Sequence, residues 1–387
     1  MEKTTLLSAK DSSAVCAYCE KHAFYGIILK KTSKITNQIR GIMGYIRKQK
    51  EKLPVVALCY DFDKTLTPDD MQAQGYIQDV GWDVESFWAR AKELAEKNNM
   101  DQNLAYMYLM VKEAEGNLIL NKKNLQEYGA KVKLYPGVRE WFARIKEYGK
   151  QRDVIVEHYI ISSGLYEMIE GTEMARRGDF ERIYASSFLF NERNVAVWPA
   201  QAINYTNKTQ FLFRISKGTL DVNDPAVNDY VKPENIRVPF SNIIYIGDSD
   251  TDIPCMRLVN ANGGHSIGVY DHEKKDKTKV YKMIKENRIK YFAPADYREG
   301  QELDTLVKSI IDKIAADTVL INKTNTDRHE QQKADKAAEI AKTLMKSIEL
   351  ESASNGKTLR ELIDAEHRNN KNIDKILKLF GEDGKDK

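Results

Sequence analysis

Two aspartates one residue apart, Asp61 and Asp63, stand directly after an apolar run at residues 55–60, V-V-A-L-C-Y. One carboxylate of such a pair can act as a nucleophile, and the other can donate and accept protons. Two carboxylates this close repel an anionic substrate unless a hard cation neutralises them, and Mg²⁺ prefers carboxylate oxygens. The residue types therefore indicate nucleophilic and acid-base chemistry that depends on a metal ion.

The elements that must position this pair are buried parallel strands. An apolar run that ends abruptly in charge is typical of such a strand, and ligands bind at the carboxyl ends of parallel strands. A second run, 241–247, ends before Asp248, and Asp252 follows. Segment 158–164 ends in small hydroxyl residues, and segment 204–218 carries lysines beside an apolar helical pattern. We expect all these segments to meet at one edge of a sheet.

In this order, the four segments resemble the four motifs of the haloacid dehalogenase (HAD) superfamily, in its phosphatase branch. The pentad Asp-Phe-Asp-Lys-Thr at 61–65 resembles motif one, and Gly-Asp-Ser-Asp-Thr-Asp at 247–252 resembles motif four. The resemblance covers residues 55–297. It implies an α/β fold, with a Rossmann-like parallel sheet as the core and a helical C1 cap placed as in phosphoserine phosphatases.

The resemblance also implies roles for single residues. Asp61 is the expected nucleophile, which forms an aspartyl-phosphate intermediate, and Asp63 is the expected general acid and base. Ser162 is expected to donate a hydrogen bond to a phosphoryl oxygen. Lys208 is expected to neutralise charge on the transferring group, and Lys217 is the rival for that role.

The implied cofactor is Mg²⁺. Asp61 and Asp248 are the expected side-chain ligands, with the backbone carbonyl of Asp63 as a third. Asp252 is expected to support the metal from its second shell or to pair with the lysine. The residues expected to line the substrate site are Thr65, Met71, Gln72, Ser163 and Gly164.

The spacing of the motifs predicts the domain organisation. About a hundred residues separate Asp61 from Ser162, far more than one crossover needs, and apolar positions at helical spacing mark 84–97 and 104–114. Segments 183–190 and 195–199 predict a small hairpin beside the core. The expected parts are a basic helical N-terminal extension at 1–53, the core at 54–68 and 135–297, the helical cap at 69–134 and a helical C-terminal extension at 298–387.

Composition excludes several classes of protein. The 387 residues are 42% hydrophobic and 30% charged, with a net charge of +3, so the whole chain has no general affinity for nucleic acid. No apolar run approaches the ~18 residues of a transmembrane segment, and no signal peptide is visible. Four cysteines in so long a chain favour a reducing, cytoplasmic location. Cys16 and Cys19 are half of a zinc site without a second pair, and we interpret them as packing residues.

The two ends of the chain differ from the core. Residues 1–52 hold 11 Lys and Arg against 4 Asp and Glu, a net of +7, which predicts amphipathic helices that pack on the core or bind a partner or membrane surface. Residues 322–387 hold 14 basic and 13 acidic residues. An apolar stripe there, followed by a capping box at 358–361, predicts a helical hairpin that docks on the core or forms a homo-oligomer. The stripe consists of Ala337, Ile340, Ala341, Leu344 and Ile348.

Taken together, these patterns predict a Mg²⁺-dependent phosphatase that acts on a small phosphorylated metabolite. Asp63 argues against the dehalogenase and P-type ATPase branches, which lack an acid at that position. A phosphotransferase with an acceptor other than water is one alternative. A binding or regulatory module that uses the core as a scaffold and acts through the helical extensions is another.

Overall fold

The computed structural model describes residues 45–271, 273–274 and 276–355. The chain divides into two compact units, residues 1–315 and 316–387, and each is described by itself. The helices predicted before residue 45, the cysteines at 16 and 19, and the helix predicted from residue 358 onward lie outside the described residues.

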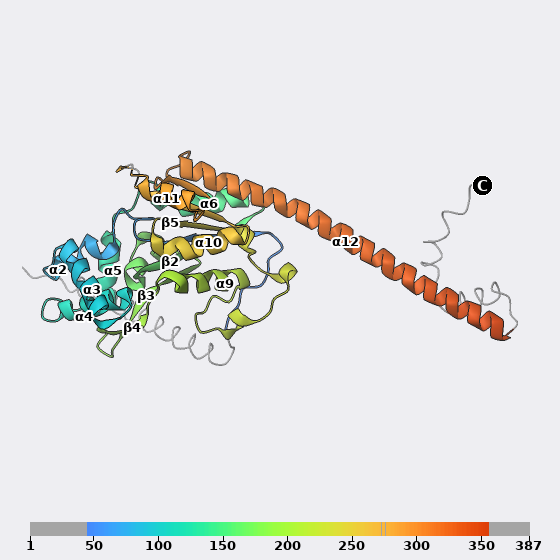
Figure 1. The fold of residues 1–387 in the computed structure, drawn as a ribbon, viewed down its shortest axis with the longest axis horizontal. Coiled ribbons are helices and arrows are strands. Elements are labelled where there is room, and N and C mark those ends of the chain that lie inside the picture. The colour runs from blue at the N-terminus through green and yellow to red at the C-terminus, as the bar shows by residue number, and fades with distance from the viewer. Residues whose placement is uncertain (1–44, 272, 275, 356–387) are drawn as a thin grey trace, which may run out of the picture. The chain divides into compact units, whose positions relative to one another are not determined.

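A seven-stranded sheet forms the centre of the first unit (Figure 1). The strand order is β4-β3-β2-β1-β5-β6-β7, and every neighbouring pair is parallel except β3 and β4. This sheet confirms the predicted Rossmann-like α/β core. The strands are β1 Val55–Tyr60, β2 Ile155–Leu165, β3 Arg182–Phe190, β4 Ala196–Gln201, β5 Ile243–Gly247, β6 His265–Tyr270 and β7 Tyr291–Pro294.

Helices connect the strands of the sheet and cover it. The α-helices are α2 Tyr76–Asp79, α3 Val84–Asn98, α4 Gln102–Ala114, α5 Lys122–Lys131, α6 Val138–Lys150, α7 Tyr166–Glu170, α8 Glu173–Arg177, α9 Thr209–Lys217, α10 Ile253–Ala261, α11 Thr278–Lys285 and α12 Glu302–Asn355. The 3-10 helices are η1 Met71–Gln74, η2 Tyr205–Lys208, η3 Pro225–Asn228, η4 Pro233–Asn235, η5 Phe240–Asn242 and η6 Asp250–Asp252.

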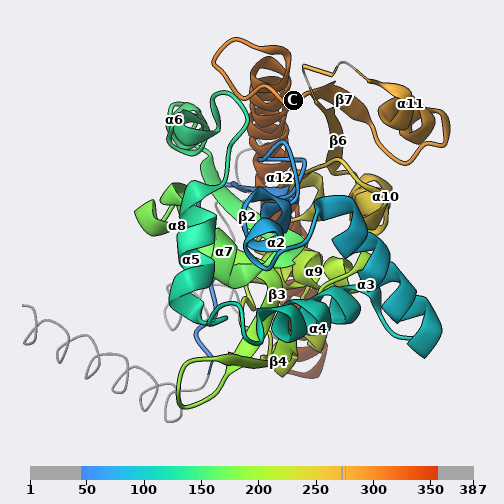
Figure 2. The ribbon, with the colours of Figure 1, turned by 90° about the vertical axis from the view of Figure 1, so that its left-hand side faces the viewer.

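Helices pack on both faces of the sheet, which is why its central strand is apolar throughout. Every residue of β1 is buried, as expected for a parallel strand covered on both sides. Val56 and Leu58 belong to the core cluster that includes residues of α6, whereas Ala57 and Cys59 belong to the cluster that includes residues of α9 and α10. Figure 2 shows α6 and α10 on opposite sides of the strands.

The predicted cap region is helical, and its helices α2, α3, α4 and α5 lie together at the left of Figure 1. Aspartates begin two of these helices: the Asp83 carboxylate accepts from the Ser86 backbone N–H at 2.9 Å, and Asp101 caps α4 in the same way. Such caps satisfy backbone donors that a helix leaves unpaired at its start. The Tyr76 hydroxyl donates to the Met110 carbonyl and so ties α2 to α4.

The hairpin of β3 and β4, which we predicted beside the core, pairs with the main sheet and extends it. β3 pairs in parallel with β2 and antiparallel with β4, which forms one edge of the sheet. The sequence pattern specifies two strands and a turn. It carries no signal that the first of them, β3, pairs with β2. Exposed Val197 and Trp198 on β4 are consistent with an edge position.

The described end of the N-terminal extension packs against the first unit through ion pairs. Arg47 Nε lies 2.7 Å from Asp224, and Lys48 Nζ lies 2.6 Å from Glu157. Glu157 also binds Arg237, and these hydrogen bonds overcome the effect of burial and lower the pKa of Glu157 to about 2. The acid therefore stays ionised and holds residues near 48 against the strands.

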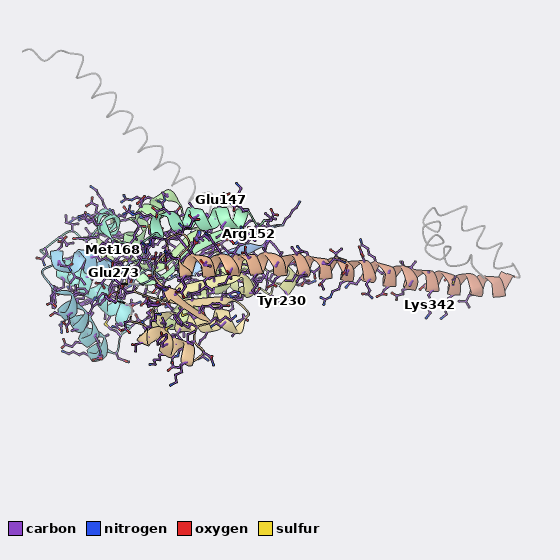
Figure 3. All side chains as sticks on the ribbon, turned by 90° about the horizontal axis from the view of Figure 1, so that it is seen from above. Glu147, Arg152, Met168, Tyr230, Glu273 and Lys342 are labelled. Atoms are coloured by element: carbon purple, nitrogen blue, oxygen red, sulfur yellow. The ribbon has the colours of Figure 1, made fainter. Side chains whose placement is uncertain are left out.

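The first part of α12 belongs to the core unit, although the sequence analysis assigned everything after residue 297 to an extension. Buried apolar side chains between Leu303 and Ile314 join the cluster that contains α6. The Arg144 guanidinium lies 3.2 Å from Asp304, and Arg152, labelled in Figure 3, pairs with Asp312. Sequence inspection missed this boundary because one helix, 54 residues long, crosses it without a break.

In the second unit, the described residues 316–355 are helical. Of the predicted stripe, Ile340 is 51% exposed, and Ala341 is buried. None of the helices within the described residues is long and apolar enough to cross a membrane.

The core position of the first turns of α12 can be tested with two matched substitutions on this helix. We predict that Ile311→Ala lowers the free energy of unfolding by about 2–5 kcal/mol, because the Ile311 side chain is fully buried. Ile321→Ala, at a position that is 58% exposed, should change it by less than about 0.5 kcal/mol. Urea denaturation measures both values. Equal losses in the two variants would contradict the assignment.

Candidate active site

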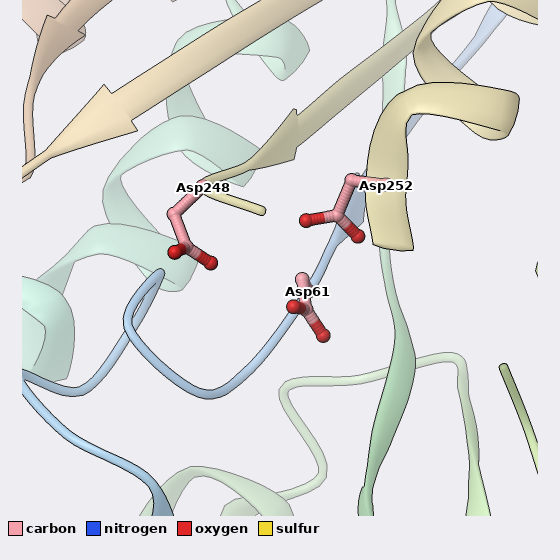
Figure 4. A group of neighbouring side chains, drawn as sticks. All are labelled: Asp61, Asp248 and Asp252. Atoms are coloured by element: carbon pink, nitrogen blue, oxygen red, sulfur yellow. The ribbon is translucent and has the colours of Figure 1, made fainter. Parts of the chain in front are cut away.

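Three buried aspartates converge at the carboxyl ends of two neighbouring strands (Figure 4). Asp61 follows β1 and Asp248 follows β5, and these strands pair directly. The Asp61 backbone N–H donates to the Ile246 carbonyl at 3.0 Å, which extends the pairing to the nucleophile position. Asp252 reaches the same point from η6. One carboxylate oxygen from each of the three lies within 4.8 Å of the others.

Burial, together with the crowding of acids, raises the pKa values of two of these aspartates, Asp61 and Asp248. Burial, then the neighbouring charges of Asp252 and Asp248, raises the pKa of Asp61 to about 7, although Lys208 opposes the shift. Burial also raises the pKa of Asp248 to about 6, against the effect of Lys279, whose Nζ lies 3.5 Å away. Each acid is held in an environment that favours either a proton or a bound cation.

The residues present fit a hard cation. Oδ1 of Asp61 is buried and accepts no hydrogen bond from any described residue, and Asp248 lies beside it with a raised pKa. Carboxylate oxygens with free lone pairs are the donors that Mg²⁺ prefers. Asp252 differs, because its two oxygens already accept hydrogen bonds from Lys208, Tyr245 and Ser249. Its free capacity for a cation is therefore smaller than that of Asp61.

Lys208 is the buried cation of the site. Its Nζ lies 2.8 Å from Asp252 Oδ1 and 3.3 Å from Asp61 Oδ1, and its side chain is fully buried. Burial disfavours the charged form, but the two carboxylates overcome that effect and raise the pKa of Lys208 above its usual value. Lys217, the rival from the sequence, instead donates to the carbonyls of Val227 and Asp229.

Asp63 is placed to carry a proton. Its Oδ1 accepts from the Met71 backbone N–H at 2.8 Å. Burial, followed by the charges of Asp70 and Asp61, holds its pKa well above the ordinary value. A carboxyl group that retains its proton near neutral pH can donate it to a leaving group. Gly164 packs against this acid, because a Cβ there would lie 2.7 Å from Asp63 Oδ2.

The hydroxyl residues after β1 and near the end of β2 surround the aspartates. Thr65 Oγ1 lies 3.5 Å from Asp248 Oδ1. Ser162 is fully buried, and its Oγ accepts from the Gly164 backbone N–H at 3.0 Å. Ser163 Oγ is buried and has no hydrogen-bond partner among the described residues, whereas its carbonyl accepts from Tyr106. Both serines line the cavity above Asp61.

A cavity of about 360 Å³ brings most of the predicted site residues together with residues of the cap. Gln72 lines it, and Met71 lies beside it, with its thioether sulfur 3.4 Å from the Leu165 backbone N. Arg90 of α3 pairs with Glu93 on the helix surface, as expected for a solvated helix charge, and does not line the cavity. Lining residues that sequence reasoning missed include Lys64, Trp88, Gln102, Asn103, Tyr106, Ser249, Thr251 and Lys279. Lys64, Ser249 and Thr251 lie inside the quoted motifs, whereas no signal marked the residues of the cap helices, which show only a core-facing apolar pattern.

The buried ion pair can be tested with two Asp→Asn changes two residues apart. We predict that Asp252→Asn lowers the free energy of unfolding by about 3 kcal/mol. This value is at the low end of the range for the loss of one partner of a buried ion pair, because Asp61 remains beside Lys208. Asp250→Asn, at an exposed position, is the control and should change it by less than about 0.5 kcal/mol. Chemical denaturation in chelator measures both. If Asp252→Asn leaves the free energy of unfolding unchanged, the ion pair does not stabilise the fold.

Known proteins are similar to this chain at low identity. An uncharacterized protein of Borreliella burgdorferi (strain ATCC 35210 / DSM 4680 / CIP 102532 / B31) is 27% identical over 281 residues, which cover 65% of this chain and 95% of that protein. A HAD family hydrolase from Salmonella enterica subsp. enterica serovar Typhi matches with a TM-score of 0.45 and 17% identity, over 68% of this chain and 73% of that one. A probable phosphoserine phosphatase from Vibrio cholerae matches with a TM-score of 0.44 and 13% identity, over 68% and 67%.

The family model of the haloacid dehalogenase-like hydrolases matches residues 58–257, just over half of the chain. The matched range contains Asp61, Asp63, Lys208, Asp248 and Asp252, and so contains all the acids and the lysine of the site. This chain therefore belongs to the haloacid dehalogenase-like hydrolases.

Proposed function

We propose that this protein is a Mg²⁺-dependent phosphatase that hydrolyses the phosphate monoester of a small metabolite. The observation that carries the proposal is the arrangement of Asp61, which lies within 3.3 Å of the buried Lys208, beside an Asp63 whose pKa is raised. The nucleophile and the proton donor therefore line one cavity, and the charge-neutralising lysine is paired with that nucleophile. Phosphoryl transfer needs these functions together.

In the first step, an Asp61 carboxylate oxygen attacks phosphorus, and the bond between phosphorus and the ester oxygen breaks. Asp63 donates its proton to that oxygen, so the alcohol leaves uncharged and Asp63 becomes a carboxylate. The product on the enzyme is an aspartyl phosphate. Burial and the neighbouring acids raise the pKa of Asp63, which favours the protonated form that this step requires.

In the second step, water attacks the phosphorus of the aspartyl phosphate. Asp63 accepts a proton from that water, and the bond between phosphorus and the Asp61 oxygen breaks. Inorganic phosphate leaves, and both aspartates return to their starting protonation states. Lys208 and the hydroxyl of Ser162 stabilise the negative charge on the phosphoryl oxygens in both steps, because they are held in place by the fold before the substrate arrives.

The residues that would hold Mg²⁺ are Asp61 and Asp248 through their side chains and Asp63 through its backbone carbonyl. Bound there, the cation would neutralise charge between the carboxylates and the phosphate. Asp252 would act through Lys208, since its oxygens are occupied by hydrogen bonds.

The roles of the two catalytic acids can be separated by kinetics. We predict that Asp61→Asn abolishes turnover of para-nitrophenyl phosphate, because it removes the nucleophile. Asp63→Asn should slow turnover of an alkyl phosphate by at least ~100-fold and that of the aryl phosphate by less, because a nitrophenolate needs little protonation. Asp250→Asn is the control. A beryllium fluoride adduct on any residue other than Asp61, or equal losses for both esters in Asp63→Asn, would contradict these roles.

The metal requirement can be tested directly. We predict that EDTA abolishes turnover of para-nitrophenyl phosphate, that Mg²⁺ restores it, and that Asp248→Ala loses it at any practical Mg²⁺ concentration. The reason is that Asp61 and Asp248 end neighbouring strands and share a buried point. Full activity of the chelated enzyme would refute this part of the proposal.

A further inference from the structure

The cavity over Asp61 has two chemically different ends. Asp61, Ser162 and Asp248 line the end at the strands. The other end is lined by the cap, through Gln72 of η1, Trp88 of α3 and Gln102, Asn103 and Tyr106 of α4. The phosphate of a bound ester would occupy the first end, and its alcohol portion would face the second.

The position of Asp63 supports this orientation. Its Oδ1 is bonded to the Met71 backbone N–H, next to Gln72, and its Oδ2 lies against Gly164. Burial and the charge of Asp63 both raise the pKa of Tyr106, which places the cap tyrosine near this acid. Because the proton donor must reach the ester oxygen, the alcohol leaves on the side of the cavity that the cap residues line.

Several polar groups on this cap side have hydrogen-bonding capacity to spare. Gln72 is 2% exposed, and its side-chain amide lines the cavity. The indole N–H of Trp88 is buried and has no partner among the described residues. The Asn103 amide N–H donates to the Ile203 carbonyl, so its oxygen remains available as an acceptor. Buried polar groups without partners are costly unless a ligand or water satisfies them.

None of these cap groups carries a charge. Of the acids that line the cavity beside them, Asp70 is paired with Lys64 Nζ at 2.7 Å, and Asp63 is assigned as the proton donor. Lys279, the other lysine of the lining, lies 3.5 Å from Asp248, at the opposite end. No arginine is among the described residues that line the cavity. An ammonium or carboxylate group on the substrate's alcohol portion would therefore lack an unpaired charge to bind.

We propose that the site takes the phosphate ester of an uncharged, polyhydroxylated alcohol, as found in a sugar or a nucleoside. This inference rests on the proposed phosphatase function. The hydroxyl oxygens accept from Trp88 Nε1 and the Gln72 amide, and the hydroxyl hydrogens donate to the oxygens of Gln72 and Asn103. Trp88 and Tyr106 pack edge to face, with ring centroids 5.6 Å apart, and provide an apolar wall for the carbon skeleton.

The test compares esters of primary alcohols, so that their intrinsic reactivities are similar. We expect kcat/KM of the Mg²⁺-loaded full chain for ribose 5-phosphate to exceed that for phosphoserine by about tenfold or more, because a site with unpaired polar groups discriminates against a ligand that leaves them unpaired. Adenosine 5′-monophosphate is the second arm. A higher value for it than for ribose 5-phosphate identifies a nucleoside as the alcohol, and the reverse identifies a free sugar.

Two tryptophan variants test the contact itself. Trp88→Phe removes the unpaired N–H and keeps an aromatic ring, and it should lower kcat/KM for the preferred ester roughly 5- to 10-fold. Turnover of para-nitrophenyl phosphate, which has no hydroxyls to accept from this N–H, should fall by a smaller factor than turnover of the preferred ester. Trp82→Phe is the matched control, because the Trp82 indole N–H already donates to Glu113 at 2.8 Å and does not line the cavity. It should leave the preference between esters unchanged.

The outcomes separate this inference from the proposed function. If para-nitrophenyl phosphate is hydrolysed but phosphoserine equals or exceeds both hydroxylated esters, the inference is overturned and the phosphatase function stands. An equal loss on all substrates in Trp88→Phe also overturns it. If no ester is hydrolysed, the proposed function fails, and calorimetry of the wild-type chain with the same esters decides the inference. Tighter binding of ribose 5-phosphate or adenosine 5′-monophosphate than of phosphoserine then supports it.

Discussion

A single buried cation among buried carboxylates is the constraint on which the rest of this site depends. Lys208 contacts Asp61 and Asp252 with its side chain fully buried, while Asp248 adds a third acid within 4.8 Å. One lysine cannot neutralise three acids, and burying uncompensated charge is costly. The remaining charge has to be met by protons or by a metal ion, which is why the pKa values of Asp61 and Asp248 are raised.

This charge balance requires a particular chain topology. Asp61 and Asp248 meet only because β1 and β5 are parallel neighbours whose carboxyl ends lie side by side. Lys208 must reach the same point from outside the sheet, and the end of η2, just before α9, places it there. Asp252 then fixes the ammonium group, while Tyr245 and Ser249 satisfy the oxygens of Asp252. The sheet therefore places Asp61 and Asp248, and the elements on one face place the lysine and the aspartate that pair beside them.

The catalytic end of the cavity could be predicted from sequence because its residues follow strands that are buried on both faces. The runs before Asp61 and Asp248 are apolar throughout, and that pattern specifies both the strand and the place where it ends. The cap end could not be predicted in the same way. Trp88 and Asn103 lie on α3 and α4, whose apolar patterns show only which side of each helix is buried. That these helices and η1 together line one cavity depends on tertiary contacts. The join between β3 and β2 and the core position of residues 302–315 escaped prediction for the same reason.

The proposed function assigns phosphoryl transfer to the strand end of the cavity and discrimination between alcohols to the cap end, in keeping with the charges at each end. Phosphoryl transfer involves the same charges whatever alcohol is released, so the strand end can be built from acids and a lysine that serve any monoester. Discrimination must then come from groups that contact only the alcohol. The cap residues proposed for this role are neutral hydrogen-bonding side chains and aromatic rings, and Asp70, which also lines the cavity, is paired with Lys64. A charged alcohol portion would lose its hydration without gaining a counter-ion, whereas a hydroxylated one exchanges hydrogen bonds with water for hydrogen bonds with Gln72, Trp88 and Asn103.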